Sequence, residues 1–177
     1  MGPFDCAPVT LAACRAVLGR LTADDLSRPT PCAEYTAGDV GRHVVRSMVL
    51  LAAVAGEQID GPAAGRLEEQ VTVTAEAALA AWRRRGLGGT VAVGRSSLPA
   101  SLAVEIIPLE LLVHGWDIAR ATGSAIDVTP EVAGYVLSRA RELVTDDKRG
   151  RSFAVEVPVR ASATVLEQLI AFTGREP

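Results

Sequence analysis

Three side chains that could bind a metal ion lie close together in the second half of the chain. Glu110, His114 and Asp117 stand at positions i, i+4 and i+7, so a helix would project all three from one face. Apolar residues before and after them extend this face, which predicts that it is buried. A buried carboxylate beside a neutral imidazole needs a partner, and a divalent metal ion would supply one. A hydrogen bond between the histidine and the carboxylate inside a helix bundle is the alternative, and the segment alone favours that alternative.

A second histidine, His43, also falls on the apolar face of a predicted helix and is expected to point into the core. His43 and His114 are the only histidines in the chain. If their helices pack together, two imidazoles and the Glu110 carboxylate converge, as metal ligands do in bundle cores. This is a ligand set of catalytic zinc, in which a fourth position stays free for water or substrate. Nickel or iron would also accept these ligands, so the spacing leaves the metal open.

Two further residues have several interpretations. Asp117 could orient a ligand imidazole, bind a metal-bound water or fill the fourth position, and we interpret it as orienting an imidazole. A surface or helix-capping role is its alternative. Arg83 opens a run of three arginines that suits the C-terminus of a helix. Contact with the carboxylate of a substrate or of a thiol cofactor is the other interpretation of Arg83.

Helices must position these residues, and the start of the helix that carries His43 has a clear signal. Thr36 and Asp39 match a capping box, which predicts a helix from Ala37 to about Gly56. Pro108 should kink the helix that carries His114, one turn before that histidine. Further helices are predicted over residues 7–21, 63–85, 99–121, 130–146 and 163–174, with a short strand or hairpin arm within 86–97.

Composition indicates one all-α domain over residues 1–177, in which 151–177 form a C-terminal extension packed on the bundle. Hydrophobic residues make up 49% of the chain and aromatic residues only 4%, which favours closely packed helices with at most a minor β element. Such a bundle could form a homodimer.

The net charge of −3 comes from interspersed acids and bases, so we expect no nucleic-acid partner. No apolar run reaches membrane-spanning length and the N-terminus has no signal-peptide pattern, so we expect a cytoplasmic protein without membrane contact. The three cysteines form no C-x-x-C pair and are interpreted as reduced thiols.

Several motifs resemble the metal-binding domain of the mycothiol-dependent maleylpyruvate isomerase family, within the DinB-like superfamily. The similar segments are Thr30-Pro31-Cys32, residues 36–45, residues 110–123 and the C-terminal residues 166–177. They span nearly the whole chain. The sequence differs from the family pattern at Tyr35, where the loop usually has tryptophan, and at Pro108, just before the glutamate.

The resemblance implies a DinB-like four-helix bundle whose metal ligands match His43, Glu110 and His114. It also implies that the metal binds a low-molecular-weight thiol such as mycothiol and lowers the pKa of that thiol, so that the thiolate adds to an electrophilic substrate. The leading hypothesis is therefore a metal-dependent thiol transferase or isomerase, with zinc as the first candidate metal. A non-catalytic metal- or ligand-binding bundle that acts by association is the alternative, and a metal-free bundle is the third hypothesis.

Overall fold

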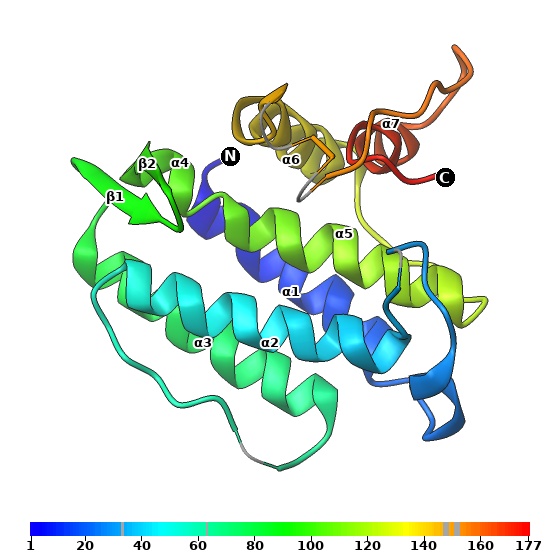
Figure 1. Ribbon diagram of the computed structural model, residues 1–177, viewed down its shortest axis with the longest axis horizontal. Helices are drawn as coiled ribbons and strands as arrows, with labels where there is room; N and C mark the ends of the chain where they lie inside the picture. The colour runs from blue at the N-terminus through cyan, green and yellow to red at the C-terminus, as the bar shows by residue number, and fades with distance from the viewer. Residues whose placement is uncertain (33, 63, 147–148, 151–152) are drawn as a thin grey trace.

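The computed structural model is mostly helical, as the composition predicts (Figure 1). It describes residues 1–32, 34–62, 64–146, 149–150 and 153–177. Ala63, at the predicted start of a helix, and Arg151, the first residue of the predicted extension, lie outside the described residues. The all-α expectation with a minor β element is confirmed, since the one small sheet among the described residues has two strands.

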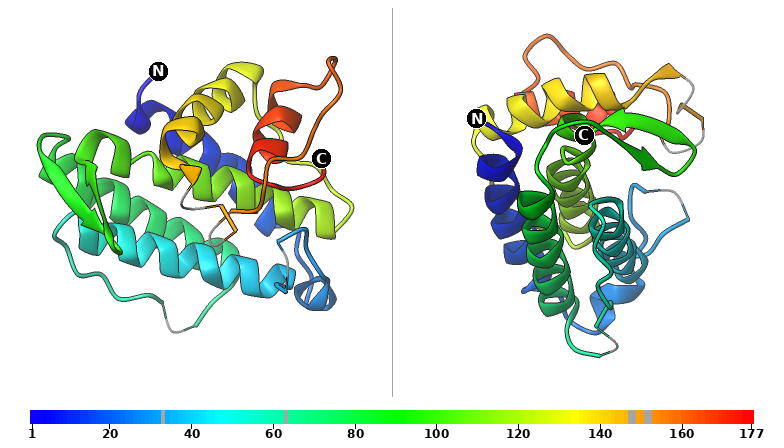
Figure 2. Two further views of the ribbon diagram at one scale, coloured as in Figure 1. Left: turned by 45° about the horizontal axis from the view of Figure 1, so that its top comes forward. Right: turned by 90° about the vertical axis from the view of Figure 1, so that its left-hand side faces the viewer.

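Four long helices form the bundle that carries the candidate site. They are α1 (Pro3–Leu18), α2 (Ala37–Val54), α3 (Leu67–Arg85) and α5 (Ile106–Ala121). Helix α1 packs against α5 and α3, while α2 packs against α3 and α5. Figure 2 shows the four helices side by side in its right-hand view. The contact between α2 and α5 is the one that matters for the site, because these two helices carry the histidines.

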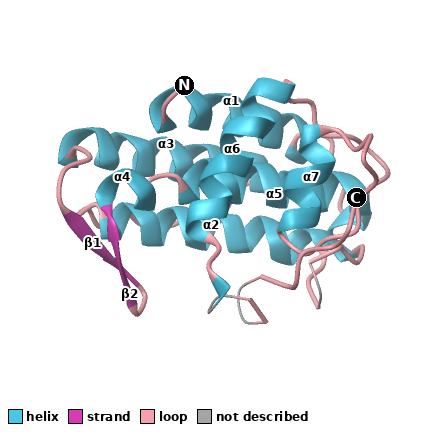
Figure 3. Cartoon of the chain, turned by 90° about the horizontal axis from the view of Figure 1, so that it is seen from above, coloured by secondary structure: helices cyan, strands magenta, loops and turns pink. Residues whose placement is uncertain are grey.

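Shorter elements lie along one side of the bundle and at both of its ends (Figure 1). They are η1 (Asp24–Ser27), β1 (Thr90–Val93), β2 (Ser96–Pro99), α4 (Ala100–Ala103), α6 (Pro130–Leu143) and α7 (Val165–Phe172). Strands β1 and β2 form an antiparallel hairpin in which Val91 pairs with Leu98. Seen from above, α6 and α7 lie across the bundle and the hairpin projects from one end (Figure 3). Helix α6 contacts α1, α5 and α7, so it connects the C-terminal helix to the bundle.

Helix α2 begins where the capping box predicts. The Thr36 hydroxyl accepts a hydrogen bond from the Asp39 amide at 3.2 Å, and the Asp39 carboxylate accepts one from the Thr36 amide at 3.1 Å. These bonds satisfy two backbone amides that a helix start leaves unpaired. They define the first turn of the helix that carries His43 two turns later.

The helix that carries His114 is interrupted earlier than the sequence predicts. The expected kink one turn before His114 is wrong, because α4 ends at Ala103 and α5 begins at Ile106. Pro108 has no amide hydrogen to bond the Val104 carbonyl, which instead accepts the Ile107 amide at 3.1 Å. Pro108 therefore lies in the first turn of α5, where proline is tolerated, and the segment from Glu110 to Ala121 continues as regular helix.

The first helix also differs from its predicted bounds. It begins at Pro3, four residues before the predicted Ala7, and ends at Leu18 instead of residue 21. Pro3 occupies the first helical position, where its fixed φ is favourable, and the Asp5 carboxylate accepts the Gly2 amide at 2.9 Å. Pro8 lies inside the helix.

The core consists largely of alanine, valine and leucine side chains shared by the four long helices. Cys6 and Cys14 are fully buried in it, and burial raises the pKa of each thiol to about 12. Both cysteines are therefore small apolar core residues, as the sequence indicates. No helix within the described ranges has the length and apolar character to cross a membrane.

One buried carboxyl group lies at the break between α4 and α5. The Glu105 side chain is 3% exposed; one oxygen accepts a hydrogen bond from the Tyr135 hydroxyl, and the other has no hydrogen-bond partner. Burial raises the pKa of Glu105, although the hydrogen bond from Tyr135 and the charge of Arg139 oppose the change. Burying the ionised carboxylate therefore lowers the free energy of unfolding, and this loss disappears when Glu105 is protonated.

We predict that Glu105→Gln raises the free energy of unfolding at pH 8. The pKa of Glu105 is higher in the folded than in the unfolded chain, so the wild type loses stability as the pH rises through the folded pKa, whereas glutamine does not titrate. The gain should shrink as the pH falls toward 4.5, the ordinary pKa of glutamate. Urea unfolding over this pH range tests it, with Glu76→Gln on the exposed side of α3 as the control. An unchanged midpoint at pH 8 would contradict the prediction.

Candidate metal centre

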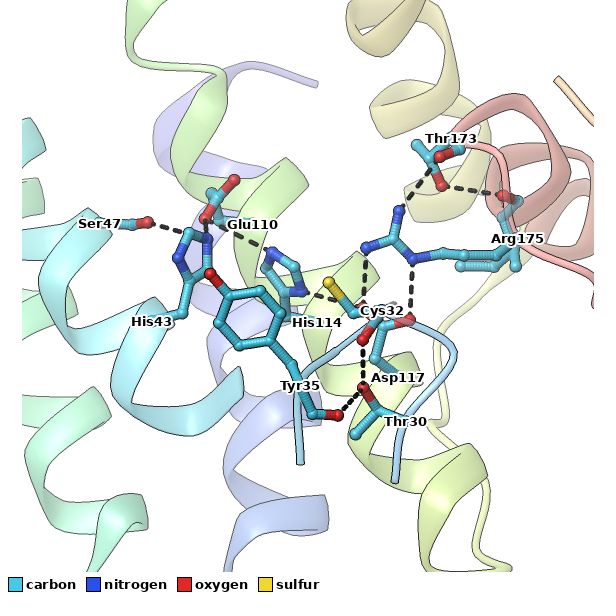
Figure 4. A network of polar contacts seen from close by, with 11 residues as sticks. Thr30, Cys32, Tyr35, His43, Ser47, Glu110, His114, Asp117, Thr173 and Arg175 are labelled. Carbon is cyan, nitrogen blue, oxygen red and sulfur yellow. Dashed lines mark hydrogen bonds and ion pairs between the residues drawn. The ribbon is translucent and has the colours of Figure 1, made fainter. Parts of the chain in front are cut away.

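The structure brings together the three residues that the sequence singled out, His43 from α2 and Glu110 and His114 from α5. The Nε2 atom of His43 lies 3.1 Å from Glu110 Oε2, and the Nε2 atom of His114 lies 3.7 Å from the same oxygen. The two imidazole rings are 4.8 Å apart between centroids and nearly perpendicular. Figure 4 shows both rings turned toward the Glu110 carboxylate. One donor atom of each residue lies within 4.8 Å of the others.

These separations fit a common metal ion. Two donor atoms bound about 2.1 Å from a tetrahedral ion lie about 3.4 Å apart. The distances from Glu110 Oε2 to His43 and His114, 3.1 and 3.7 Å, lie on either side of that value. Two imidazole nitrogens and a carboxylate oxygen are also the donor types that zinc, nickel and iron accept. The residues present could therefore hold a divalent ion after small side-chain movements.

The charge and burial of the three residues are suited to a cation. Burial alone would raise the pKa of Glu110, but the hydrogen bond from His43 and the charges of His114 and His43 hold it at about 2. Glu110 is therefore a carboxylate at neutral pH. The side chain of His114 is 10% exposed and that of His43 is 36% exposed. The expectation that His43 points into the core is wrong, because its ring lies at the wall of an open pocket.

Asp117 lies behind His114 and away from Glu110. Its Oδ2 atom accepts a hydrogen bond from His114 Nδ1 at 2.9 Å, and its carboxylate is fully buried. Arg175, near the C-terminus, donates Nε to Oδ1 at 2.8 Å and Nη2 to Oδ2 at 2.9 Å. Burial would raise the pKa of Asp117, but the hydrogen bonds from His114 and Arg175 lower it below its usual value. Asp117 is therefore an ionised group bonded to the imidazole nitrogen that faces away from Glu110.

A second set of metal-ligand types, Cys32, His114 and Asp117, also lies within 4.8 Å. This set is less suited to a cation for two reasons. The guanidinium of Arg175 already binds both oxygens of Asp117, and its positive charge would repel a metal ion there. Burial also raises the pKa of the Cys32 thiol, whereas a metal ligand must be the thiolate. The geometry therefore favours the set that contains Glu110.

The three convergent residues line a pocket with a volume of about 750 Å³. Its apolar wall consists of Val40, Leu50, Leu51, Val93, Ile106, Leu109, Val113 and Phe153. Its polar wall includes Cys32, Tyr35, Ser47, Thr173 and Arg175. The volume is sufficient for a small organic molecule, and a metal bound by the triad would face this space.

Three further residues, Arg83, Arg175 and Tyr35, differ in how their positions compare with the sequence interpretation. Arg83 does not line the pocket, and its guanidinium stacks over the Phe4 ring at 5.3 Å from the centroid. The structure thus does not bring Arg83 to the site. Sequence reasoning gave no site role to Arg175, because a single arginine three residues after the terminal helix has no spacing relation to α5. Tyr35, noted as a departure from the family pattern, lines the pocket with its ring 6.2 Å from that of His43.

Comparison with known proteins agrees with the motifs. Residues 10–85, from α1 to the end of α3, match the model of the mycothiol maleylpyruvate isomerase N-terminal domain. Uncharacterized proteins of two Mycobacterium tuberculosis strains, CDC 1551 and H37Rv, are each 33% identical over 168 residues, which cover 90% of this chain and 90% of each relative. No solved structure matches the chain. The chain belongs to the mycothiol maleylpyruvate isomerase N-terminal domain family.

Proposed function

We propose that this protein binds a divalent metal ion, with zinc as the first candidate, and catalyses a thiol-dependent transfer or isomerisation. His43, Glu110 and His114 would hold the ion, and a low-molecular-weight thiol of the mycothiol type would supply the nucleophile. The observation that carries the proposal is the convergence of two imidazoles on one ionised carboxylate at the wall of a 750 Å³ pocket. Membership of a family named for mycothiol supports the choice of thiol.

A bound divalent ion would lower the pKa of a coordinated thiol, so that the sulfur is present as thiolate at neutral pH. The chain's own residues would keep one side of the ion open. Asp117 is bonded to His114 Nδ1 and to Arg175, so it is not free to occupy a fourth position. The open side therefore faces the pocket, where the thiol and its acceptor would meet.

The apolar side chains that line the pocket indicate that the electrophilic substrate, which accepts the thiol, is largely apolar. Leu51 lies about two turns from His43 on α2, and Ile106 lies about one turn from Glu110 on α5. Leu50, next to Leu51, is 55% exposed. A molecule that covers this wall would remove apolar surface from water, which favours binding. We therefore propose an uncharged electrophile with an apolar body, such as an α,β-unsaturated carbonyl compound. In its reaction the thiolate sulfur bonds to the β-carbon, the carbon–carbon π bond is lost, and the α-carbon takes a proton from solvent.

The metal assignment predicts one divalent ion per chain. Elemental analysis after reconstitution with zinc, nickel or iron should find that stoichiometry in the wild type. His43→Ala, His114→Ala and Glu110→Gln should each weaken binding by more than about 100-fold, because each removes a donor. Glu76→Gln, an exposed glutamate on α3, is the matched control and should bind as the wild type does. If the wild type took up no ion, or if either histidine variant bound it fully, the assignment would be wrong.

The pocket predicts how the enzyme selects among acceptors. With mycothiol and 2-alkenals of increasing chain length, kcat/KM should rise as the alkyl chain covers more of the apolar wall. Leu50→Gln should reduce that value for the longest alkenal by about tenfold. Val73→Gln changes a similarly exposed apolar residue of α3 that does not line the pocket, and it should have no effect. A metal-loaded protein that conjugates none of these acceptors would instead support the non-catalytic binding bundle.

A further inference from the structure

A continuous chain of polar contacts connects the C-terminal segment to the candidate metal centre. It runs from the Arg175 guanidinium, through the Asp117 carboxylate, to His114 Nδ1, and each donor–acceptor distance is 2.8 or 2.9 Å (Figure 4). Asp117 is fully buried, and the side chains of Arg175 and His114 are each 10% exposed. The contacts are therefore shielded from water, which strengthens them and makes their loss costly.

The chain of contacts determines which nitrogen of His114 carries the proton. Arginine is always protonated and only donates, so its two bonds keep Asp117 as an acceptor. The contact between Asp117 and His114 therefore requires a hydrogen on Nδ1. A neutral imidazole then has its lone pair on Nε2, the atom that lies 3.7 Å from Glu110 Oε2. This is the tautomer in which Nε2 can bind an ion held by Glu110.

The backbone around Arg175 is built to hold it in place. Gly174 has a φ of 87°, a left-handed conformation that disfavours other residues. A Cβ atom on Gly174 would also lie 2.5 Å from the Cβ of Ala154, so only glycine allows this close approach. The Arg175 amide bonds the Ile170 carbonyl at 3.2 Å, and its Nη1 bonds the Thr173 carbonyl at 3.1 Å. All three guanidinium nitrogens thus have partners, and the side chain has one defined position.

We propose that Arg175 is a positioning residue that holds Asp117 so that His114 keeps its hydrogen on Nδ1 and turns Nε2 toward Glu110. The segment that follows α7 is on this basis a part of the site, although it lies 58 residues from Asp117 in the sequence. The proposal rests on the proposed function for its effect on metal binding. Its effect on the state of His114 applies to the metal-free protein as well.

The test compares Arg175→Gln with Arg160→Gln. Arg160 lies in the same C-terminal region and pairs with Glu167 at 3.1 Å, but its side chain is 72% exposed, so this variant removes the same charge away from the site. Long-range ¹H–¹⁵N spectra of the metal-free protein report the tautomer of each histidine, and His43→Ala assigns the two signals. In the wild type His114 should have its hydrogen on Nδ1. In Arg175→Gln it should populate both tautomers, and the zinc Kd should rise by about 10- to 100-fold. Arg160→Gln should match the wild type.

A merely structural role for Arg175 would leave the His114 tautomer unchanged, and that result overturns the proposal. If Arg175→Gln does not fold, Arg175→Lys serves in its place, because lysine keeps the charge but cannot bind both carboxylate oxygens in the same way. Arg175→Lys should change the His114 tautomer and the zinc Kd in the same direction as Arg175→Gln does. The absence of any change overturns the proposal. If the wild type binds no zinc, the proposed metal function fails, whereas the tautomer comparison still decides the role of Arg175.

Discussion

The contact between one carboxylate and two imidazoles connects the two central helices of this protein. Glu110 lies 3.1 Å from His43 on α2 and 3.7 Å from His114 on its own helix. Placing an ionised carboxylate among apolar helices is costly unless positive charge or hydrogen-bond donors compensate for the lost water. The imidazoles supply part of that compensation and hold the pKa of Glu110 at about 2. A divalent ion would supply the rest, because it would face three donors at once.

The remaining elements support this contact in different ways. The capping box of Thr36 and Asp39 starts α2 so that His43 faces α5. The break caused by Pro108 lies before the part of α5 that carries the candidate ligands, so Glu110 and His114 stay one helical turn apart in regular helix. The C-terminal segment contributes Thr173 and Arg175 to the polar wall of the pocket, and Arg175 also binds Asp117. The front of the site remains a pocket with one largely apolar wall.

Local sequence signals predicted those parts of the structure that depend on neighbouring residues. The capping box and the i, i+4 spacing of Glu110 and His114 are local, and both are found where predicted. The kink was expected one turn before His114, whereas the helix breaks between Ala103 and Ile106, next to the Val104 carbonyl that Pro108 cannot bond. The role of Arg175 could not be predicted, since its contact with Asp117 spans 58 residues and depends on how α7 packs. Helical periodicity likewise placed His43 on an inward face but could not show that this face borders a pocket.

The central claim is that His43, Glu110 and His114 bind one divalent ion. The most direct test is anomalous diffraction at the zinc absorption edge from crystals of the protein reconstituted with zinc. The account predicts a single strong peak within about 2.0–2.2 Å of His43 Nε2, His114 Nε2 and a Glu110 carboxylate oxygen, with the open side of the ion toward the pocket. A peak centred on Cys32, or no peak at the three residues in a fully reconstituted protein, would contradict it.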